Sequence, residues 1–232
     1  MKTYQLSDLT QAQLLEATTL DEKGVSHYPW LDVADISLTS EEQLLVDVTK
    51  ARLSQGETML MNEATIWARG IYPLLILAER GQIRAWAEVA LSSTFSDVKL
   101  TGTADGVLAR VIGGIVRTPY LVTLEAKRSV EAKNPQFQFL GQLLVAAKLN
   151  WQGRSDAKQN MEDDTPQEIF GCYTIGDVWT FARATVQGLD ESGNSGATKP
   201  LMTVETSREF VERLEAETIL KILKKIVARY EN

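Results

Sequence analysis

Three consecutive segments of the chain combine apolar, aromatic and β-branched residues in the manner of β-strands. They span residues 83–95, 98–111 and 120–128, and Gly113 and Gly114 separate the second segment from the third. Because short connections join them, we expect the three strands to form one antiparallel meander. The rest of the chain is interpreted around this meander.

A helix is predicted directly after the third strand. Asn134 suits the N-cap, Pro135 suits the first helical position, and the apolar run continues to about Leu149. A helix at this point allows a fourth strand that lies parallel to the third. Residues 168–177 and 178–188 are then typical of a β-hairpin. The fold class that follows is α/β, a mixed β-sheet flanked by helices.

The segments on either side of this core predict further helices. A short helix is expected near residues 11–17, and the sequence Ser-Glu-Glu-Gln at 40–43 is a capping box that opens a helix to about Ser54. The last segment, from Ser207 onward, has the apolar spacing of an amphipathic helix, with an acidic first half and a basic second half.

Residues 58–81 are apolar over most of their length and predict a long helix that ends at Gly81 and is kinked at Pro73. An alternative is a helix as far as Gly70 followed by a strand at 74–79.

We expect a single domain with three parts. Residues 1–56 form a helical extension, residues 57–188 form the core, and residues 189–232 form a loop and a C-terminal helix. No apolar run approaches the roughly 20 residues that span a bilayer, and the acidic N-terminus lacks the apolar core of a secretion signal. A cytoplasmic protein without membrane attachment is therefore expected.

Composition excludes several classes of protein. Cys172 is the only cysteine and His27 the only histidine, so an intramolecular disulfide, a thiolate zinc cluster and a multi-histidine metal site are excluded. The net charge of −7 argues against a protein that binds nucleic acid through overall basicity. Locally, however, the stretch from Glu125 to Lys158 has six basic and three acidic residues. This basic block is either a phosphate-binding surface or an ordinary solvated face.

Among the charged residues of the meander, three lie where an apolar residue would be expected. Glu125 and Lys127 are two residues apart, so both project from the same face of their strand, and Asp105 lies on the preceding strand. Two carboxylates beside an ammonium are costly to bury unless they pair or hold an ion. Mg²⁺ prefers carboxylate oxygens, and a bound Mg²⁺ can polarise a phosphodiester and activate a water. Gly102 and Gly106 would let a polynucleotide backbone approach closely.

The sequence around these residues resembles the PD-(D/E)XK nuclease superfamily, the restriction-endonuclease-like fold. The resemblance rests on GTADGVL around Asp105 and TLEAKRS around Glu125, although Ala104 stands where the superfamily usually has proline. The following helix, with Gln138 and Gln142, is similar to the glutamine helix of that superfamily. NEATIWARGIYPLL and EIFGCYTIGDVWTFARA resemble the first helix and the closing hairpin of the N-terminal nuclease domain of type I restriction motor subunits. Together these pieces cover roughly residues 60–188.

The resemblance implies a Mg²⁺- or Mn²⁺-dependent nuclease on a restriction-endonuclease-like core. Asp105 and Glu125 would be metal ligands, and Lys127 would activate the water or stabilise charge. Gln142, or else Gln138, would shape the site. Glu63 would be an accessory acid and metal ligand, with Glu88 as its rival.

Nucleic acid, expected to be DNA, would be the partner. The contacts would come from Arg128, Lys133, Gln138 and Lys148. Small nucleases of this fold often need two sites to cut both strands, so a homodimer is compatible with the resemblance. Plain structural interpretations stay open: Glu125 and Lys127 as a simple ion pair, Asp105 as a turn residue, and Glu63 as a carboxylate favoured by the helix dipole. The alternative function is a catalytically inactive nucleic-acid-binding or protein-interaction module on the same fold.

Overall fold

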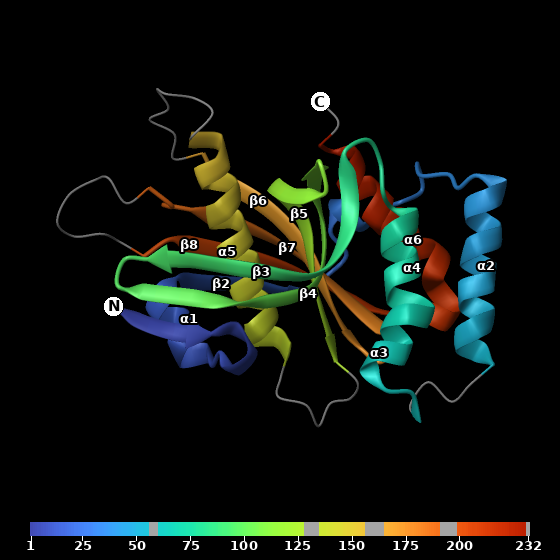
Figure 1. The fold of residues 1–232 in the computed structure, drawn as a ribbon, viewed down its shortest axis with the longest axis horizontal. Helices are drawn as coiled ribbons and strands as arrows, with labels where there is room; N and C mark the ends of the chain where they lie inside the picture. The colour runs from blue at the N-terminus through green and yellow to red at the C-terminus, as the bar shows by residue number, and fades with distance from the viewer. Residues whose placement is uncertain (56–59, 128–134, 156–164, 191–198, 231–232) are drawn as a thin grey trace.

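The chain folds around a mixed β-sheet with helices packed on both faces (Figure 1). The computed structural model describes residues 1–55, 60–127, 135–155, 165–190 and 199–230. The described strands are β1 (Lys2–Gln5), β2 (Thr19–Val25), β3 (Ile83–Phe95), β4 (Val98–Ile112), β5 (Ile115–Lys127), β6 (Gln167–Ile175), β7 (Val178–Gln187) and β8 (Leu201–Val211). They form one eight-stranded sheet in the order β1-β4-β5-β6-β7-β8-β2, with β3 paired to β4 outside this path.

The predicted meander is confirmed. β3, β4 and β5 pair antiparallel in sequence order, and β6 then lies parallel to β5, as the crossover helix allows. Gly113 and Gly114 have φ values of 59° and 76°, which a tight hairpin turn requires and glycine adopts without strain. β5 begins at Ile115, earlier than predicted, because its pairing with β4 continues up to this turn. The hairpin of β6 and β7 is also confirmed.

Helix α5 (Pro135–Ser155) packs on one face of the sheet. Every residue from Gln138 to Lys148 is buried, which explains the absence of an amphipathic period in its sequence. The helix extends beyond its predicted end at Leu149. There the Asn150 side chain accepts a hydrogen bond from the Tyr120 N–H and donates one to the Tyr120 carbonyl, both at 2.7 Å. This pair of bonds fastens the end of α5 to β5. The short α1 (Gln11–Ala17) belongs to the same core.

Helices α6 (Glu212–Ala228), α4 (Tyr72–Leu77) and α2 (Ser40–Ser54) lie at the opposite face (Figure 1). The capping box of α2 is present one residue earlier than predicted. Thr39 is the N-cap, because its hydroxyl accepts from the Glu42 N–H and the Glu42 carboxylate accepts from the Thr39 N–H. Among the described residues, no helix has both the length and the apolar character needed to cross a membrane.

The long helix predicted for residues 58–81 is shorter and has an irregular middle. It comprises α3 (Glu63–Ile66), the π-helical turn η4 (Trp67–Ile71) and α4, which ends at Leu77. The alternative strand at 74–79 is wrong. Pro73 is the second residue of α4 and follows the π turn closely, so the N–H that proline lacks falls where the helix is already irregular.

Three strands were not predicted from the sequence. β1 and β2 lie in the supposed helical extension, and β8 takes residues up to Val211, so the C-terminal helix begins at Glu212 rather than at Ser207. β1 and β2 are mostly polar and exposed, and they are strands because β4 and β8 offer them parallel edges. Pairing between segments far apart in sequence leaves no local signal in such short polar runs.

Gly102 and Gly106 have a different role from the one predicted. A Cβ atom on Gly106 would lie 2.5 Å from the Trp67 ring, and one on Gly102 would lie 2.8 Å from Leu6 Cβ. The missing side chains therefore let η4 and η1 (Leu6–Asp8) pack tightly against β4. They do not leave room for a polynucleotide.

Replacing Gly106 by alanine should destabilise the protein. The added methyl group must displace Trp67, and overpacking of this kind costs about 1–3 kcal/mol. Urea denaturation followed by tryptophan fluorescence measures the loss. An unchanged midpoint would show that η4 does not pack on β4 in this way.

Candidate active site

The three charged residues of the meander come together at one point. β4 and β5 pair so that Gly106 faces Leu124, which brings the next positions, Asp105 and Glu125, opposite each other. Asp105 is fixed there, because its Oδ2 accepts a hydrogen bond of 2.7 Å from the Ala126 N–H. Asp105 is therefore a residue of a paired strand and not of a turn.

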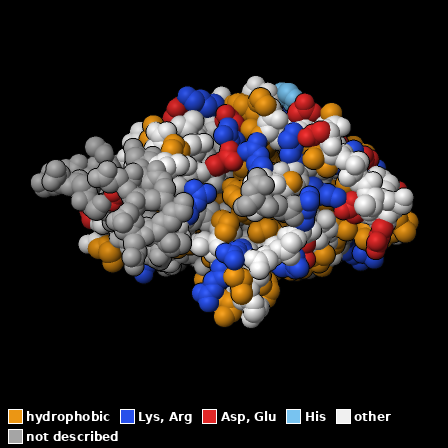
Figure 2. Space-filling model, turned by 90° about the horizontal axis from the view of Figure 1, so that it is seen from above, with side chains coloured by type: hydrophobic (Ala, Val, Ile, Leu, Met, Phe, Trp, Pro, Cys, Tyr) orange, Lys and Arg blue, Asp and Glu red, His pale blue; other side chains and the backbone are white. Residues whose placement is uncertain are grey.

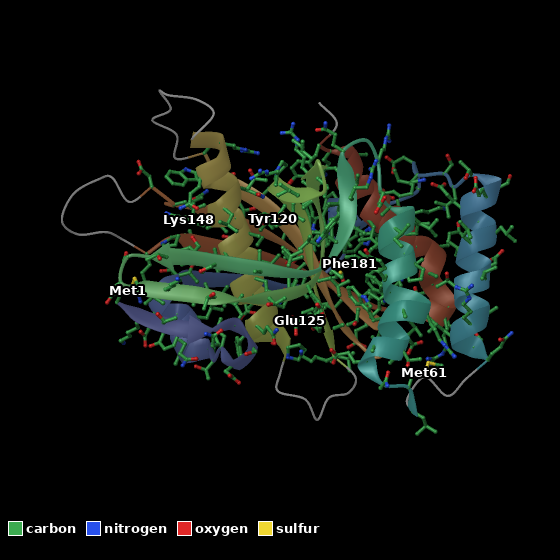
Figure 3. The ribbon with its side chains drawn as sticks, viewed as in Figure 1. Met1, Met61, Tyr120, Glu125, Lys148 and Phe181 are labelled. Atoms are coloured by element: carbon green, nitrogen blue, oxygen red, sulfur yellow. The ribbon has the colours of Figure 1, made fainter. Side chains whose placement is uncertain are left out.

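Glu125 is the most buried member of this cluster, with no exposed surface. Its Oε1 lies 2.5 Å from Lys127 Nζ, and its Oε2 accepts a hydrogen bond of 2.6 Å from Gln142 Nε2. Gln142 also donates to the Thr103 carbonyl at 3.4 Å. The glutamine of α5 thus reaches the carboxylates of the sheet, as predicted. Glu125 lies beside one end of α5 in Figure 3.

The electrostatics of the cluster reflect two neighbouring acids in a poorly solvated place. Burial and the charge of Asp105 raise the pKa of Glu125 to about 7, against the opposing effects of Lys127 and Gln142. Burial also raises the pKa of Asp105, and the charge of Glu88 adds to this shift. Burial alone would lower the pKa of Lys127, but the hydrogen bond and charge of Glu125 hold it above its ordinary value.

A cavity of about 210 Å³ opens beside Asp105. Glu63 from the start of α3 and Glu88 from β3 both line it, so both candidates for the accessory acid face the same space as Asp105. Trp67 forms another part of the wall. Asn62 is the N-cap that places Glu63 in the first turn of α3, because its side chain accepts a hydrogen bond from the Thr65 N–H.

Glu88 has an unusual backbone for a strand residue. Its φ is 54°, in the left-handed region that residues other than glycine seldom adopt. The pairs on either side, Ala87 with Gly106 and Val89 with Ala104, place it opposite Asp105. Strain of this kind is concentrated at functional sites, where the surrounding structure holds it in place. The position of Glu88 beside Asp105 therefore marks it as a functional candidate equal to Glu63.

The residues predicted to contact nucleic acid differ in what the structure shows of them. Lys148 is 3% exposed, its ammonium donates to the Leu189 carbonyl and lies 4.8 Å from the centre of the Trp151 ring, and Figure 3 shows it in the half of α5 away from Glu125. Gln138 is 9% exposed. Both residues therefore have little surface to present to a polymer. Arg128 and Lys133 lie outside the described residues.

The carboxylates of the cluster can be compared with the ligands that Mg²⁺ usually takes. Among the residues that the structure describes, no three Asp, Glu, His or Cys side chains form a complete metal-binding group. Mg²⁺ is usually held by only one or two carboxylates and keeps several waters. Asp105 and Glu125 supply two such carboxylates, and the charge of Asp105 raises the pKa of Glu125, a repulsion that a cation would relieve. The residues present therefore fit a Mg²⁺ or Mn²⁺ ion.

The chain is a mixed α/β protein with a helix-flanked eight-stranded sheet and a cluster of acids and one lysine in which Glu125 is buried. No protein-family model matches its sequence, and no curated protein matches it either.

Proposed function

We propose that this protein is a Mg²⁺-dependent nuclease that hydrolyses phosphodiester bonds in DNA, on a core of the PD-(D/E)XK type. The observation that carries the proposal is the convergence of Asp105, Glu125, Lys127 and Gln142 from β4, β5 and α5. The order of helix, three-stranded meander, helix and parallel strand also supports it, because the superfamily resemblance was assigned to those same segments.

Each residue has a role in this proposal. Asp105 and Glu125 would hold the ion, which supplies Lewis-acid activation of the phosphate and of a water. Lys127 would hold that water by a hydrogen bond and offset negative charge as it develops on the phosphate. Gln142 keeps Glu125 in place through its 2.6 Å hydrogen bond. Glu63 and Glu88 line the cavity and would orient waters around the ion.

A second function is favoured by the burial of Glu125. Both of its oxygens are already engaged by Lys127 and Gln142, an arrangement that a catalytically inactive nucleic-acid-binding or interaction module could retain for stability alone. Calorimetric titration with Mn²⁺ separates the two functions. The nuclease should bind Mn²⁺ and lose binding in Asp105→Asn, whereas the inactive module should give no Asp105-dependent heat.

The direct test is incubation with plasmid DNA in Mg²⁺ or Mn²⁺, where we expect cleavage that EDTA abolishes. A homodimer would bring two such sites to the two strands, so the products should include linear as well as nicked plasmid if the protein is dimeric. Failure to cut DNA in either metal over a range of pH would contradict the proposal.

Lys127→Ala should abolish this cleavage. The ammonium is the side chain proposed to hydrogen-bond the attacking water, and loss of one such electrostatic contact costs about a hundredfold or more in rate. The variant also removes the partner of buried Glu125, so its urea midpoint should be measured alongside. Lys23→Ala, at an exposed lysine on β2, is the control and should cut normally. Full activity in a folded Lys127→Ala protein would point to a contaminating nuclease.

A further inference from the structure

A second and larger cavity, of about 940 Å³, lies where β3 begins and where α5 and α6 end. Arg80, Arg110, Arg154, Arg229 and Tyr230 contribute to its lining, and no described residue of the lining is acidic. Figure 2 views the molecule from above and shows Lys and Arg side chains near the middle of that surface, with Asp and Glu side chains among them. The four arginines come from four separate parts of the sequence, so no local motif indicates the cavity.

This arginine pocket is separate from the acidic cluster. Arg110 is five residues beyond Asp105 on β4, which corresponds to about 17 Å of strand. Arg154 is twelve residues beyond Gln142 on α5, which corresponds to about 18 Å of helix. Two different elements thus give a similar separation, too large for one small ligand to touch both sites.

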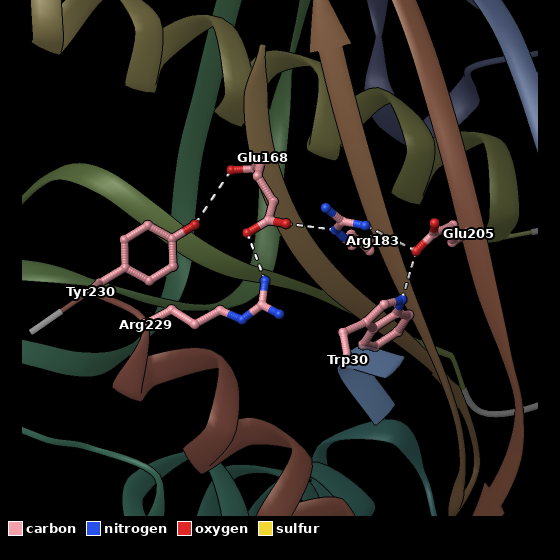
Figure 4. Close-up of polar contacts among 6 residues, drawn as sticks. All are labelled: Trp30, Glu168, Arg183, Glu205, Arg229 and Tyr230. Atoms are coloured by element: carbon pink, nitrogen blue, oxygen red, sulfur yellow. Dashed lines mark hydrogen bonds and ion pairs between the residues drawn. The ribbon is translucent and has the colours of Figure 1, made fainter. Parts of the chain in front are cut away.

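The wall of the pocket is held by a polar network (Figure 4). The Arg229 guanidinium lies 2.9 Å from Glu168 Oε2 and over the Phe170 ring, and the Tyr230 hydroxyl donates to the Glu168 carbonyl at 3.4 Å. Glu168 Oε1 binds Arg183 Nε at 2.6 Å. On β4, Arg110 Nε donates to Gln82 Oε1 at 2.9 Å. Arg110 and Arg229 are therefore oriented before any ligand arrives.

The negative ends of α5 and α6 offset only part of the positive charge of the four arginines. The carboxyl ends of α5 and α6 each carry about half a negative charge, so together they offset about one arginine. Glu168 sits behind the wall and offsets another, although it is shared with Arg183. The described part of the lining thus presents four arginine side chains and no carboxylate. Such a group of guanidinium side chains is a ready site for an anion.

We propose that the arginine pocket binds a ligand that carries two or more phosphate groups. Guanidinium groups bind phosphate oxygens through paired hydrogen bonds, and four of them match the charge of a diphosphate or triphosphate. The cavity volume suits a ligand of nucleotide size. The phosphates could belong to a free polyphosphate or nucleotide, or to a nucleic-acid backbone, and both sources share the chemistry that the arginines recognise.

Calorimetric titration in EDTA tests the proposal without any contribution from a metal at the acidic cluster. Inorganic pyrophosphate and ATP are the free ligands, and a short single-stranded oligonucleotide represents a nucleic-acid backbone. We expect binding that weakens with added salt, because the contacts are exposed ion pairs. The double variant Arg110→Gln/Arg154→Gln should weaken it at least tenfold. Arg52→Gln, which removes an exposed arginine on α2, should change it less than twofold.

The outcomes separate the sources and the two proposals. Binding of pyrophosphate and ATP alone assigns the pocket to free phosphorylated ligands, and competition by the oligonucleotide assigns it to a nucleic-acid backbone. If none of the three probes binds more tightly than about 1 mM, or if the double variant binds as well as the parent protein, the proposal is overturned. Asp105→Asn should bind pyrophosphate normally, so phosphate binding in this pocket is tested independently of the proposed nuclease activity.

Discussion

Asp105→Asn should lower Mg²⁺-dependent cleavage of plasmid DNA by at least about a hundredfold while leaving the fold intact. A metal ion contributes several kcal/mol of charge stabilisation to such a reaction, and each 1.4 kcal/mol corresponds to about tenfold in rate. The asparagine keeps an oxygen that can accept the hydrogen bond from the Ala126 N–H. It also removes the neighbouring charge that raises the pKa of Glu125. Its free energy of unfolding should therefore be unchanged or higher.

The matched control is Asp97→Asn, which makes the same chemical change at an exposed position in the turn between β3 and β4. It should cut plasmid DNA at the parent rate and bind Mn²⁺ as the parent does. Plasmid cleavage, stopped at set times, and calorimetric titration with Mn²⁺ test this expectation when both variants are used at equal concentration. Parent-level cleavage by Asp105→Asn would remove Asp105 from the site and with it the proposed metal centre.

The protein should lose stability as the pH rises from about 5 to 8, mainly because of Glu212. Burial raises the pKa of Glu212 to about 8, and the charge of Asp177 adds to the shift, while the hydrogen bond from Trp179 opposes it. A folded-state pKa above the ordinary 4.5 means that the folded protein holds the proton more tightly than the unfolded chain. This contribution is fully present below pH 4.5 and disappears as the pH passes 8. Its size is on the order of a few kcal/mol.

Glu212→Gln should remove most of this dependence on pH. Glutamine is the uncharged analogue of the protonated acid and can still accept from Trp179 Nε1, which lies 2.8 Å from Glu212 Oε2. Urea denaturation at several pH values should show a free energy of unfolding close to the parent value at pH 5 and higher than the parent at pH 8. A smaller slope should persist, because the pKa of Glu125 is also raised, to about 7.

Glu209→Gln is the comparison for this experiment, since Glu209 is exposed on β8, close to Glu212 in sequence. It should follow the parent curve at every pH. Should Glu212→Gln retain the full pH dependence of the parent, Glu212 would have to be ionised in the folded state and the explanation would be wrong.

Glu212 also fills the space over Gly70 in η4, where a Cβ atom would lie 2.6 Å from its Oε1. Its charge state therefore bears on the turn that carries Trp67 to the cavity beside Asp105.

The central segments could be predicted because their signals are local. The meander, the helix after it and the β6–β7 hairpin all carry strand runs, paired glycines or a favourable helix start in their own sequence. The cluster followed from the same logic, since alternation along β5 puts Glu125 and Lys127 on one face. Gln142 was reached only through the superfamily resemblance, and the structure places its amide on Glu125.

Other features depended on contacts that no local pattern reveals. Lys148 was interpreted as a surface cation within a basic block, but it is 3% exposed and its ammonium donates to the Leu189 carbonyl. Gly106 was interpreted as an opening for a ligand, but Trp67 fills that space from a helix far away in sequence. In both cases the same residue type suits an exposed functional site or a tight internal contact. Packing alone decides between them.

By itself the sequence determined the strands and helix of the central core and the presence of two acids and a lysine on adjacent strands. Hydrophobic pattern and strand periodicity are properties of neighbouring residues, so a single segment is sufficient to show them. The tertiary structure decided the polar strands β1 and β2, the strand β8 in place of a helical turn, the strained Glu88 opposite Asp105, and the arginine pocket. Each of these depends on distant parts of the chain being brought together, and folding supplies that proximity through burial of the two cores on either side of the sheet.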